Sequence, residues 1–357
     1  MLDKTEKLLK QLTEVSGVPG FEAEVRGIIR AELAGITAVE QDKIGSIVCR
    51  KTGAQDAPKV MLAAHMDEIG FMVKQLTKDG HIRFVPLGGW WEQVMLAQRV
   101  IIKTSKGDVP GVLGAKPPHI LTAEERKKMV EKQDMYIDIG ATSREEVEAA
   151  GVRPGDPIVP VSEFTPMASG KTYLGKAWDD RVGCALFIQT IQRLVKESHP
   201  NTVYGVGTVQ EEVGLRGAKT TAHVVEPDVA IILESDICYD LPGMKQDEPL
   251  VALGKGPSLL IFDAGMIPNT RLRDLVIETA KEHNIPLQFS SMEGGRTDGG
   301  IIHLHNEGVP TIVLSVPARH IHSHAGIIHR GDYDHLLNLL VALVKKLDAA
   351  SVRGLTE

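Results

Sequence analysis

The sequence predicts an α/β protein, a helix-covered and largely parallel sheet interrupted by a smaller inserted β-barrel domain. Two observations carry this prediction. Near the N-terminus and after residue 175, apolar runs alternate with helical patterns, as in parallel sheets covered on both faces. Between residues 70 and 161, short alternating runs are separated by Gly and Pro, which favours a β-rich domain. We expect one domain from residues 1–70 and 164–357, with residues 71–163 inserted.

The composition is that of an ordinary globular protein. The 357 residues are 43% hydrophobic and 24% charged, and their net charge of -7 disfavours binding to nucleic acid. No apolar run approaches a membrane span, and the N-terminus lacks the apolar core of a signal peptide. Cys49, Cys184 and Cys238 are odd in number and far apart, which favours reduced thiols. We therefore expect a cytoplasmic protein without membrane or nucleic-acid partners.

The N-terminal part contains two helical patterns and two strand patterns. Leucines at helical spacing predict a helix over residues 3–15, which the turn residues at 16–20 (SGVPG) end. A second helix is expected over residues 22–33. Strands are expected at 46–50 and at 59–64, the latter continuously apolar.

The inserted segment has a different pattern. Alternating strands are expected at residues 82–85 and 100–103, with short helices at 123–132 and 143–150. Residues 151–157 (GVRPGDP) are rich in turn formers and predict the exit from this domain.

The C-terminal part returns to alternating helices and strands. Helices are expected at 180–194, 215–224, 271–283 and 333–347, and strands at 202–209, 229–233 and 311–314.

Carboxylates and imidazoles follow four of these strands. The strand at 59–64 is followed by His65 and Asp67, and the strand at 202–209 by Glu211 and Glu212. Ligand sites in open α/β sheets lie outside the carboxyl ends of the strands, so these side chains are expected at one edge. The other two strands lead to Glu234 and Asp236, and to His320, His322 and His324.

A fifth acidic group, Asp179 and Asp180, opens the helix at 180–194, where one aspartate can serve as a cap. Nitrogen and oxygen ligands without thiolates suit a pair of cations such as zinc, cobalt or manganese. Glu211, the first member of its pair, is free to act as general base. Asp67 is placed to orient the imidazole of His65.

At these residues the chain resembles the glutamyl aminopeptidase / TET (tetrahedral) aminopeptidase family of dinuclear metallopeptidases. The resemblance spans nearly the whole chain, with the family's motifs in order. They are residues 65–70 (HMDEIG), 177–183 (AWDDRVG), 210–218 (QEEVGLRGA), 295–300 (GRTDGG) and 319–323 (RHIHS).

The resemblance implies a zinc-exopeptidase-like fold and an enzyme that releases N-terminal amino acids from short peptides with a free N-terminus. It implies two divalent metal ions per subunit, zinc first. One ion would be bound by His65 and Glu234 and the other by Glu212 and His322, with Asp179 bridging and Glu211 as base. Arg296, Thr297 and Asp298 would line the substrate pocket. The inserted domain would be the family's dimerisation domain, and the dimers would assemble into a hollow dodecamer.

The chain departs from the family pattern at three places. Glu234 stands where the family commonly has Asp, and Asp236 is a rival ligand two residues on. His320 and His324 stand where the family often has tyrosine and proline. These imidazoles could form hydrogen bonds, bind additional metal or tune the site. Arg296 is positioned either to meet an acidic substrate side chain or to face solvent.

Three other functions are compatible with parts of this pattern. An amidohydrolase or deacylase acting on a non-peptide amide would use the same metal ligands. A glycosidase would need Glu211 and Glu212 as opposed carboxyls, which adjacent residues rarely provide, and only 4% of the chain is aromatic. A regulatory or scaffold protein with a decayed site would not need this full set of ligands.

Overall fold

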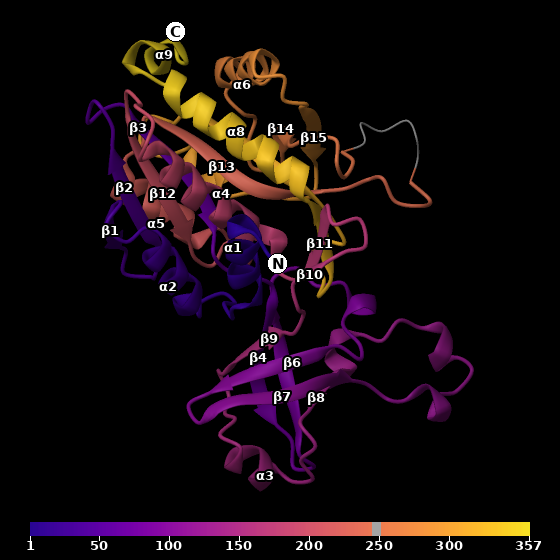
Figure 1. The fold of residues 1–357 in the computed structure, drawn as a ribbon. Coiled ribbons are helices and arrows are strands. Elements are labelled where there is room, and N and C mark those ends of the chain that lie inside the picture. Colours follow the sequence, from indigo (N-terminus) through magenta and orange to yellow (C-terminus); the bar gives the residue numbers. More distant parts are fainter. Residues whose placement is uncertain (245–250) are drawn as a thin grey trace.

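The computed structural model describes residues 1–244 and 251–357, and within them an 11-stranded sheet forms the centre (Figure 1). Its middle strands run parallel in the order β12, β3, β13, β16. Outside them, β2, β14 and β17 pair antiparallel with this set, and β15 pairs parallel with β14. The predicted α/β class is confirmed, with antiparallel pairs added outside the parallel strands. The strands are β1 (Ala38–Gln41), β2 (Ile47–Thr52), β3 (Lys59–His65), β10 (Thr165–Pro166), β11 (Thr172–Gly175), β12 (Thr202–Thr208), β13 (Val229–Ile237), β14 (Ser258–Asp263), β15 (Gln288–Met292), β16 (Thr311–Arg319) and β17 (Gly326–His329).

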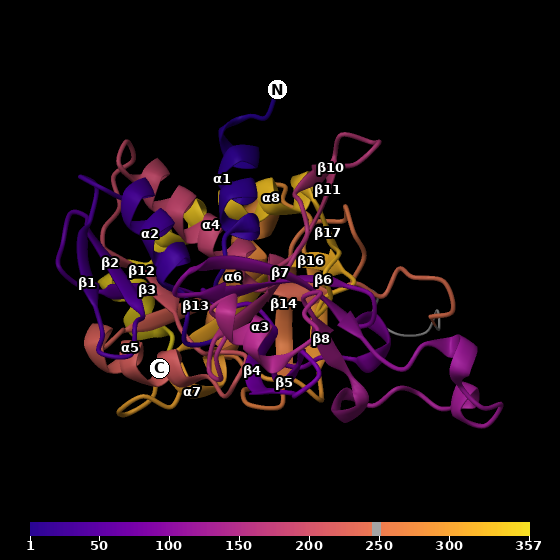
Figure 2. The same ribbon diagram turned by 90° about the horizontal axis from the view of Figure 1, so that it is seen from below.

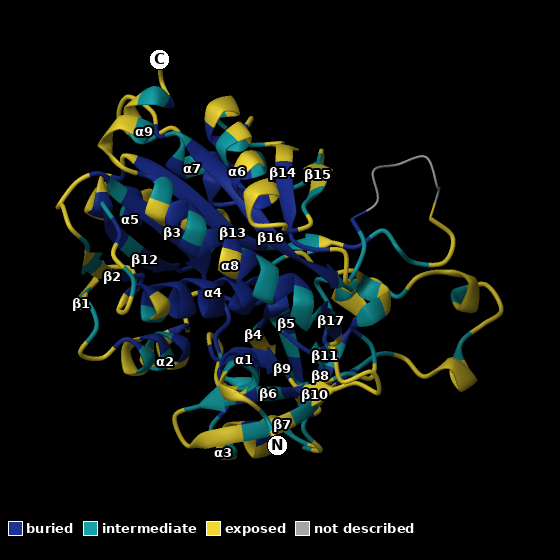
Figure 3. Ribbon diagram, turned by 45° about the horizontal axis from the view of Figure 1, so that its top comes forward, coloured by how far each residue is buried: buried dark blue, intermediate teal, exposed yellow. Residues whose placement is uncertain are grey.

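Helices cover both faces of this sheet. Successive residues of a strand point to opposite faces. Leu62 of β3 accordingly packs in the apolar cluster with α1, α2, α4, α6 and α8, whereas Met61 and Ala63 pack in the cluster with α5 and α7. The central strands and α4 are buried almost throughout (Figure 3). The helices are α1 (Lys4–Glu14), α2 (Ala23–Glu32), α4 (Trp178–Leu194), α5 (Arg216–Val225), α6 (Thr270–Glu282), α7 (Gly299–Ile302), α8 (Arg330–Lys346) and α9 (Ala349–Gly354).

A closed six-stranded barrel interrupts this layered structure after β3, as expected. It has its own apolar core, in which the ring of Phe71 packs on Phe84 and Trp90 at centroid distances of 5.0 and 4.7 Å. The view from below shows the barrel in front of the main sheet (Figure 2). Its strands are β4 (Gly70–Leu76), β5 (His81–Leu87), β6 (Arg99–Thr104), β7 (Gly107–Gly114), β8 (Tyr136–Asp138) and β9 (Pro157–Pro160).

One helix expected in the inserted segment is wrong. Residues 123–132 contain the 3-10 turn η3 (Glu125–Lys127) in place of an α-helix, and further 3-10 turns flank it or stand elsewhere in the segment. The run at 124–128 is charged throughout and has no apolar face to bury, so packing cannot stabilise a helix there. The other expected helix forms as α3 (Arg144–Ala149), whose amide at Glu146 is capped by the Ser143 hydroxyl. The remaining 3-10 turns are η1 (Glu92–Val94), η2 (Pro118–Ile120) and η4 (Lys132–Asp134).

Within the described ranges, none of the helices combines the length and the apolar character required to cross a bilayer.

Candidate metal centre

The carboxyl ends of the parallel strands bring the five predicted metal ligands together. His65 ends β3, Glu234 lies in β13, Glu212 follows β12 and His322 follows β16. With Asp179 these residues form two groups, whose potential ligand atoms lie within 4.8 Å of one another in each group. One group is His65, Asp179 and Glu234, and the other is Asp179, Glu212 and His322. Asp179 belongs to both.

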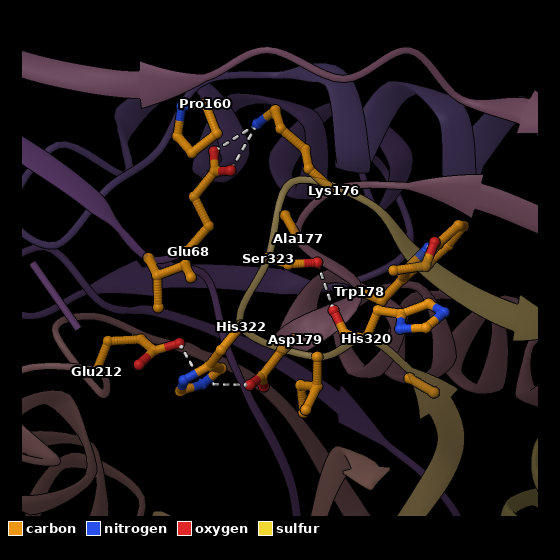
Figure 4. Close-up of a pocket in the computed structure, with 14 residues that line it drawn as sticks. Glu68, Pro160, Lys176, Ala177, Trp178, Asp179, Glu212, His320, His322 and Ser323 are labelled. Atoms are coloured by element: carbon orange, nitrogen blue, oxygen red, sulfur yellow. Dashed lines mark hydrogen bonds and ion pairs between the residues drawn. The ribbon is translucent and has the colours of Figure 1, made fainter. Parts of the chain in front are cut away.

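The carboxylate of Asp179 stands between the two imidazoles. Its Oδ1 lies 3.0 Å from Nε2 of His65. Its Oδ2 lies 3.1 Å from Nε2 of His322, the contact that Figure 4 shows. The neighbouring Asp180 has a different task. Its Oδ1 accepts from the amide of Gly183 at 2.9 Å, as a helix cap does, and its Oδ2 accepts from the amide of His65. Of the two aspartates at the start of α4, Asp179 therefore lies between the histidines and Asp180 caps the helix.

Each imidazole is held through its other nitrogen. Nδ1 of His65 is 3.0 Å from the carbonyl oxygen of Asp67, and Nδ1 of His322 is 2.8 Å from the carbonyl oxygen of Gly89. A backbone carbonyl at Nδ1 places the proton there and leaves Nε2 free as a ligand atom. Both Nε2 atoms face Asp179, so the two rings are arranged as metal ligands.

Asp67 contacts His65, as expected, and also supports a second segment of the site. Its carbonyl oxygen, and not its carboxylate, orients His65; the nearer carboxylate oxygen lies 3.7 Å from Nδ1. The fully buried carboxylate accepts from the amides of Glu211 and Glu212, at 3.0 and 3.1 Å. Asp67 thus fixes the turn that carries the predicted base and one predicted ligand.

The charges of the site fit divalent cations. Burial raises the pKa values of Glu211, Glu212 and Glu234, because water no longer stabilises their charged forms. Burial lowers the pKa of His322, but hydrogen bonds to Asp179 and Glu212 raise it to about 11. Oε1 of Glu212 is buried and lies 3.3 Å from Nε2 of His322. A buried carboxylate oxygen beside imidazole nitrogens is a donor set that zinc, cobalt or manganese accepts.

A cleft of about 600 Å³ opens beside the two groups. Glu211, Arg296 and Thr297 line it, as predicted for the base and for the substrate pocket. Asp298 is buried and is not among the residues that line this cleft; its Oδ2 accepts from the hydroxyl of Thr208 at 2.6 Å. Burial raises the pKa of Asp298 to about 6. The structure therefore brings Arg296 and Thr297 to the cleft surface and sets Asp298 behind it.

The alternative ligands lie outside both groups in the described part of the chain. Asp236 lines the cleft but accepts a hydrogen bond from Ser258 at 2.5 Å. His324 is buried, its ring 5.2 Å from that of Trp90, and neither ring nitrogen has a hydrogen-bond partner in the described ranges. His320 is exposed.

The contribution of Gly89 was not predicted: its carbonyl oxygen holds His322, and the residue lines the cleft. Sequence reasoning also passed over the buried residues Glu68, Lys176 and Arg181, although each lies in or beside a quoted motif.

The model of the M42 glutamyl aminopeptidase family matches residues 45–339. The chain belongs to this family. It is therefore a peptide hydrolase and an aminopeptidase, and membership of a metallopeptidase family implies divalent metal ions. A second model, AMPT, matches residues 3–28.

Two curated relatives carry different substrate names. The glutamyl aminopeptidase of Lactococcus lactis subsp. cremoris and the lysyl aminopeptidase of Pyrococcus furiosus are each 35% identical over 348 residues. Each alignment covers 96% of this chain and 97% of the relative. Overall identity therefore does not choose between an acidic and a basic N-terminal residue.

Solved structures agree over the whole fold. The TET aminopeptidase from Thaumarchaeota archaeon SCGC AB-539-E09 is 50% identical, with a TM-score of 0.97 and 99% of both chains covered. The TET1 peptidase of Pyrococcus horikoshii, described as assembling into a tetrahedron or a large octahedral shell, is 32% identical with a TM-score of 0.86. Its match covers 96% of this chain and 100% of that one. The predicted resemblance to TET aminopeptidases is confirmed.

Proposed function

We propose that this chain is a two-metal aminopeptidase that releases N-terminal residues from short peptides, with Glu211 as general base. His65 and Glu234 would hold one cation, Glu212 and His322 the other, and Asp179 both. The observation that carries the proposal is the carboxylate of Asp179, 3.0 and 3.1 Å from two imidazoles whose other nitrogens are already held.

When bound, such a cation pair supplies Lewis acidity, which makes water acidic and polarises a carbonyl group. Glu211 then has a defined task. Burial raises the pKa of its carboxyl group, so it is suited to take a proton from the attacking water and to return it to the departing amine. The amides of Glu211 and Glu212 are tied to Asp67, which keeps the base at a fixed position during both transfers.

The acidic lining of the cleft favours substrates with a free amino terminus. Glu211, Glu234 and Asp236 all line it and would attract an ammonium group. An N-acetylated peptide lacks this charge and adds bulk, so it would be excluded. We propose that Arg296 and Thr297 meet the side chain of the N-terminal residue, with Arg296 favouring an acidic one.

For the assembly, we propose that residues 71–163 are the association domain and that residues 1–70 and 164–357 carry the chemistry. Dimers formed through the inserted domain would build a dodecamer. The Pyrococcus horikoshii TET1 shells support this assembly. Zinc is the first candidate for the native metal, and cobalt and manganese are the others.

The test is hydrolysis of aminoacyl-p-nitroanilides and short peptides by chelated enzyme to which zinc, cobalt or manganese is added back. Free-amine substrates should be cleaved only with metal, and N-acetylated forms should stay intact. Glu211→Gln should lower kcat by roughly 10²–10⁴-fold, the usual contribution of a general base, with metal content unchanged. Glu226→Gln, at an exposed carboxylate, should behave as wild type.

If metal-loaded protein leaves every free-amine substrate intact, the aminopeptidase mechanism fails. Cleavage of N-acyl amides under the same conditions would instead support the amidohydrolase, which shares the ligands but not the recognition of the amine.

A further inference from the structure

A buried ion cluster lies beside the metal centre. Glu68, Lys176 and Arg181 are 2%, 3% and 0% exposed. Nζ of Lys176 is 2.6 and 2.7 Å from the two carboxylate oxygens of Glu68, and Nη2 of Arg181 is 3.3 Å from Oε1 (Figure 4 shows the lysine pair). Burying charges is costly, and a buried ion pair is often no more stable than apolar residues of the same volume. Stability alone is therefore a weak reason for this cluster.

The two cations flank the shared carboxylate in the sequence. Lys176 lies three residues before Asp179, and Arg181 lies two residues after it. Both reach the same carboxylate, so Glu68 holds both ends of the segment that presents Asp179 to the histidines. Arg181 also donates to the carbonyl oxygens of Leu12 in the last turn of α1 and of Gly17 in the connection to α2, which anchors the segment to both.

Glu68 itself belongs to the segment that carries His65. Its amide donates to the carbonyl of Gly17 at 2.9 Å, and its neighbour Asp67 holds the turn of Glu211 and Glu212. The adjacent side chains of Asp67 and Glu68 thus support two different segments of the centre. Asp67 holds the turn after β12, and Glu68 holds the segment that opens α4.

We propose that Glu68, Lys176 and Arg181 form a clamp that positions Asp179 between His65 and His322. They are positioning residues, because they act through the backbone of Asp179. Glu68 and Lys176 line a cavity of about 20 Å³ together with Asp179, Glu212 and His322, so the clamp lies directly behind the ligands. The inference rests on the proposed metal centre, but it concerns the affinity for metal and not the peptidase reaction.

The experiment measures zinc and cobalt binding to the chelated full-length protein by competition with a chromophoric chelator. Glu68→Gln keeps the side-chain shape and removes the charge, and Lys176→Met removes the partner. Each should lower metal affinity by about 10–100-fold, as loss of an outer-shell partner does. The visible absorption of the cobalt form should change in both, because Asp179 no longer holds its geometry. Lys176→Arg keeps the charge and should recover part of the affinity.

Leu272→Ala on α6 is the matched control, since it removes a buried side chain away from the centre and lowers the melting temperature. It should leave metal affinity and the cobalt spectrum unchanged. The clamp is refuted if Glu68→Gln and Lys176→Met bind both metals as wild type does, or if Leu272→Ala loses as much affinity at equal loss of melting temperature. If Glu68→Gln does not fold, the two Lys176 variants decide. If the wild-type protein binds no metal, the proposed metal centre is refuted. That result is distinct from refutation of the clamp, in which the wild type binds metal and the variants bind it equally well.

Discussion

The two halves of the proposed metal centre each present one imidazole, but different parts of the fold hold the two rings. His65 is the last residue of a central strand, its side chain is 2% exposed, and Nδ1 is held by the carbonyl of Asp67 two residues away. His322 lies in the loop after β16, its side chain is 36% exposed, and Nδ1 is held by Gly89, 233 residues away in the loop after β5. The first half is built within the sheet. The second half exists only where a loop of the barrel segment meets a loop of the main sheet.

This difference teaches which parts of the centre depend on the inserted barrel. His65 ends a strand that lies between β12 and β13 and pairs with Thr208 of β12, and the partner of its Nδ1 lies only two residues away. A loop residue with φ of 56° has no ladder, and its ring direction is set by the contact with Gly89. We therefore expect changes at the shared carboxylate to affect both halves, and changes in the loops to affect the His322 half alone.

The largest effect is expected for Asp179→Asn, because this residue faces both imidazoles. A neutral amide cannot balance two cations, so both metal affinities should fall by more than the roughly 10–100-fold that loss of an outer-shell partner costs. Metal content after dialysis, measured by atomic emission, should drop from two ions per chain to none. Asp108→Asn, at an exposed carboxylate in the barrel, should keep two. Retention of one tight ion by Asp179→Asn would mean that the halves do not share this ligand.

The fold and the grouping of the candidate ligands were predictable to the extent that they rest on regular elements. The apolar run at 59–64 and the three other strands of the parallel set are long enough to be recognised, and the carboxyl ends of three of the four lead to His65, Glu211, Glu212 and Glu234. Most strands outside this parallel set were not predicted. β10 and β17 are too short to show a period, and pairing with neighbours decides their conformation.

Contacts between distant segments could not be predicted from local pattern. The carbonyl of Gly89 offers no side chain to notice, and only the docking of the barrel brings it to His322. Similarly, Glu68, Lys176 and Arg181 look like ordinary charged residues until the fold buries them together. The two histidines near His322 in the sequence also differ in their surroundings, which local sequence does not reveal. His320 is exposed and His324 is buried against Trp90.

An effect of intermediate size, on stability at low pH, is expected from His324, which lies two residues after His322. Burial, aided by the charge of Lys176, lowers the pKa of His324 to about 4, below the unfolded value of about 6.5. The folded state then binds fewer protons than the unfolded state, so this contribution to stability is present above pH 6.5 and is lost as pH falls towards 4. At pH 5 the titration of His324 lowers the free energy of unfolding by roughly 2 kcal/mol.

His324→Phe keeps a ring against Trp90 and removes the titration. Urea unfolding of chelated protein at pH 7 and pH 5 should show a smaller loss of stability in the variant than in wild type, by that amount. His283→Gln, at an exposed histidine, should follow wild type. Equal losses of unfolding free energy in wild type and His324→Phe would mean that His324 is protonated as readily in the folded protein as in the unfolded one.

The smallest effect, and the most selective, is expected for Gly89→Ala. A Cβ at Gly89 would stand 3.2 Å from Nδ1 of His322, so the ring or the loop must shift by a few tenths of an ångström. Mild overpacking of this kind costs roughly 1 kcal/mol, or about five-fold in affinity. Stepwise titration with cobalt should show one of the two binding events weakened and the other unchanged. Gly27→Ala on α2 adds a Cβ that meets no atom within 4 Å and should change neither event. Equal weakening of both events by Gly89→Ala would contradict the division, because the strand-borne half would then depend on the barrel loop as much as the loop-borne half does.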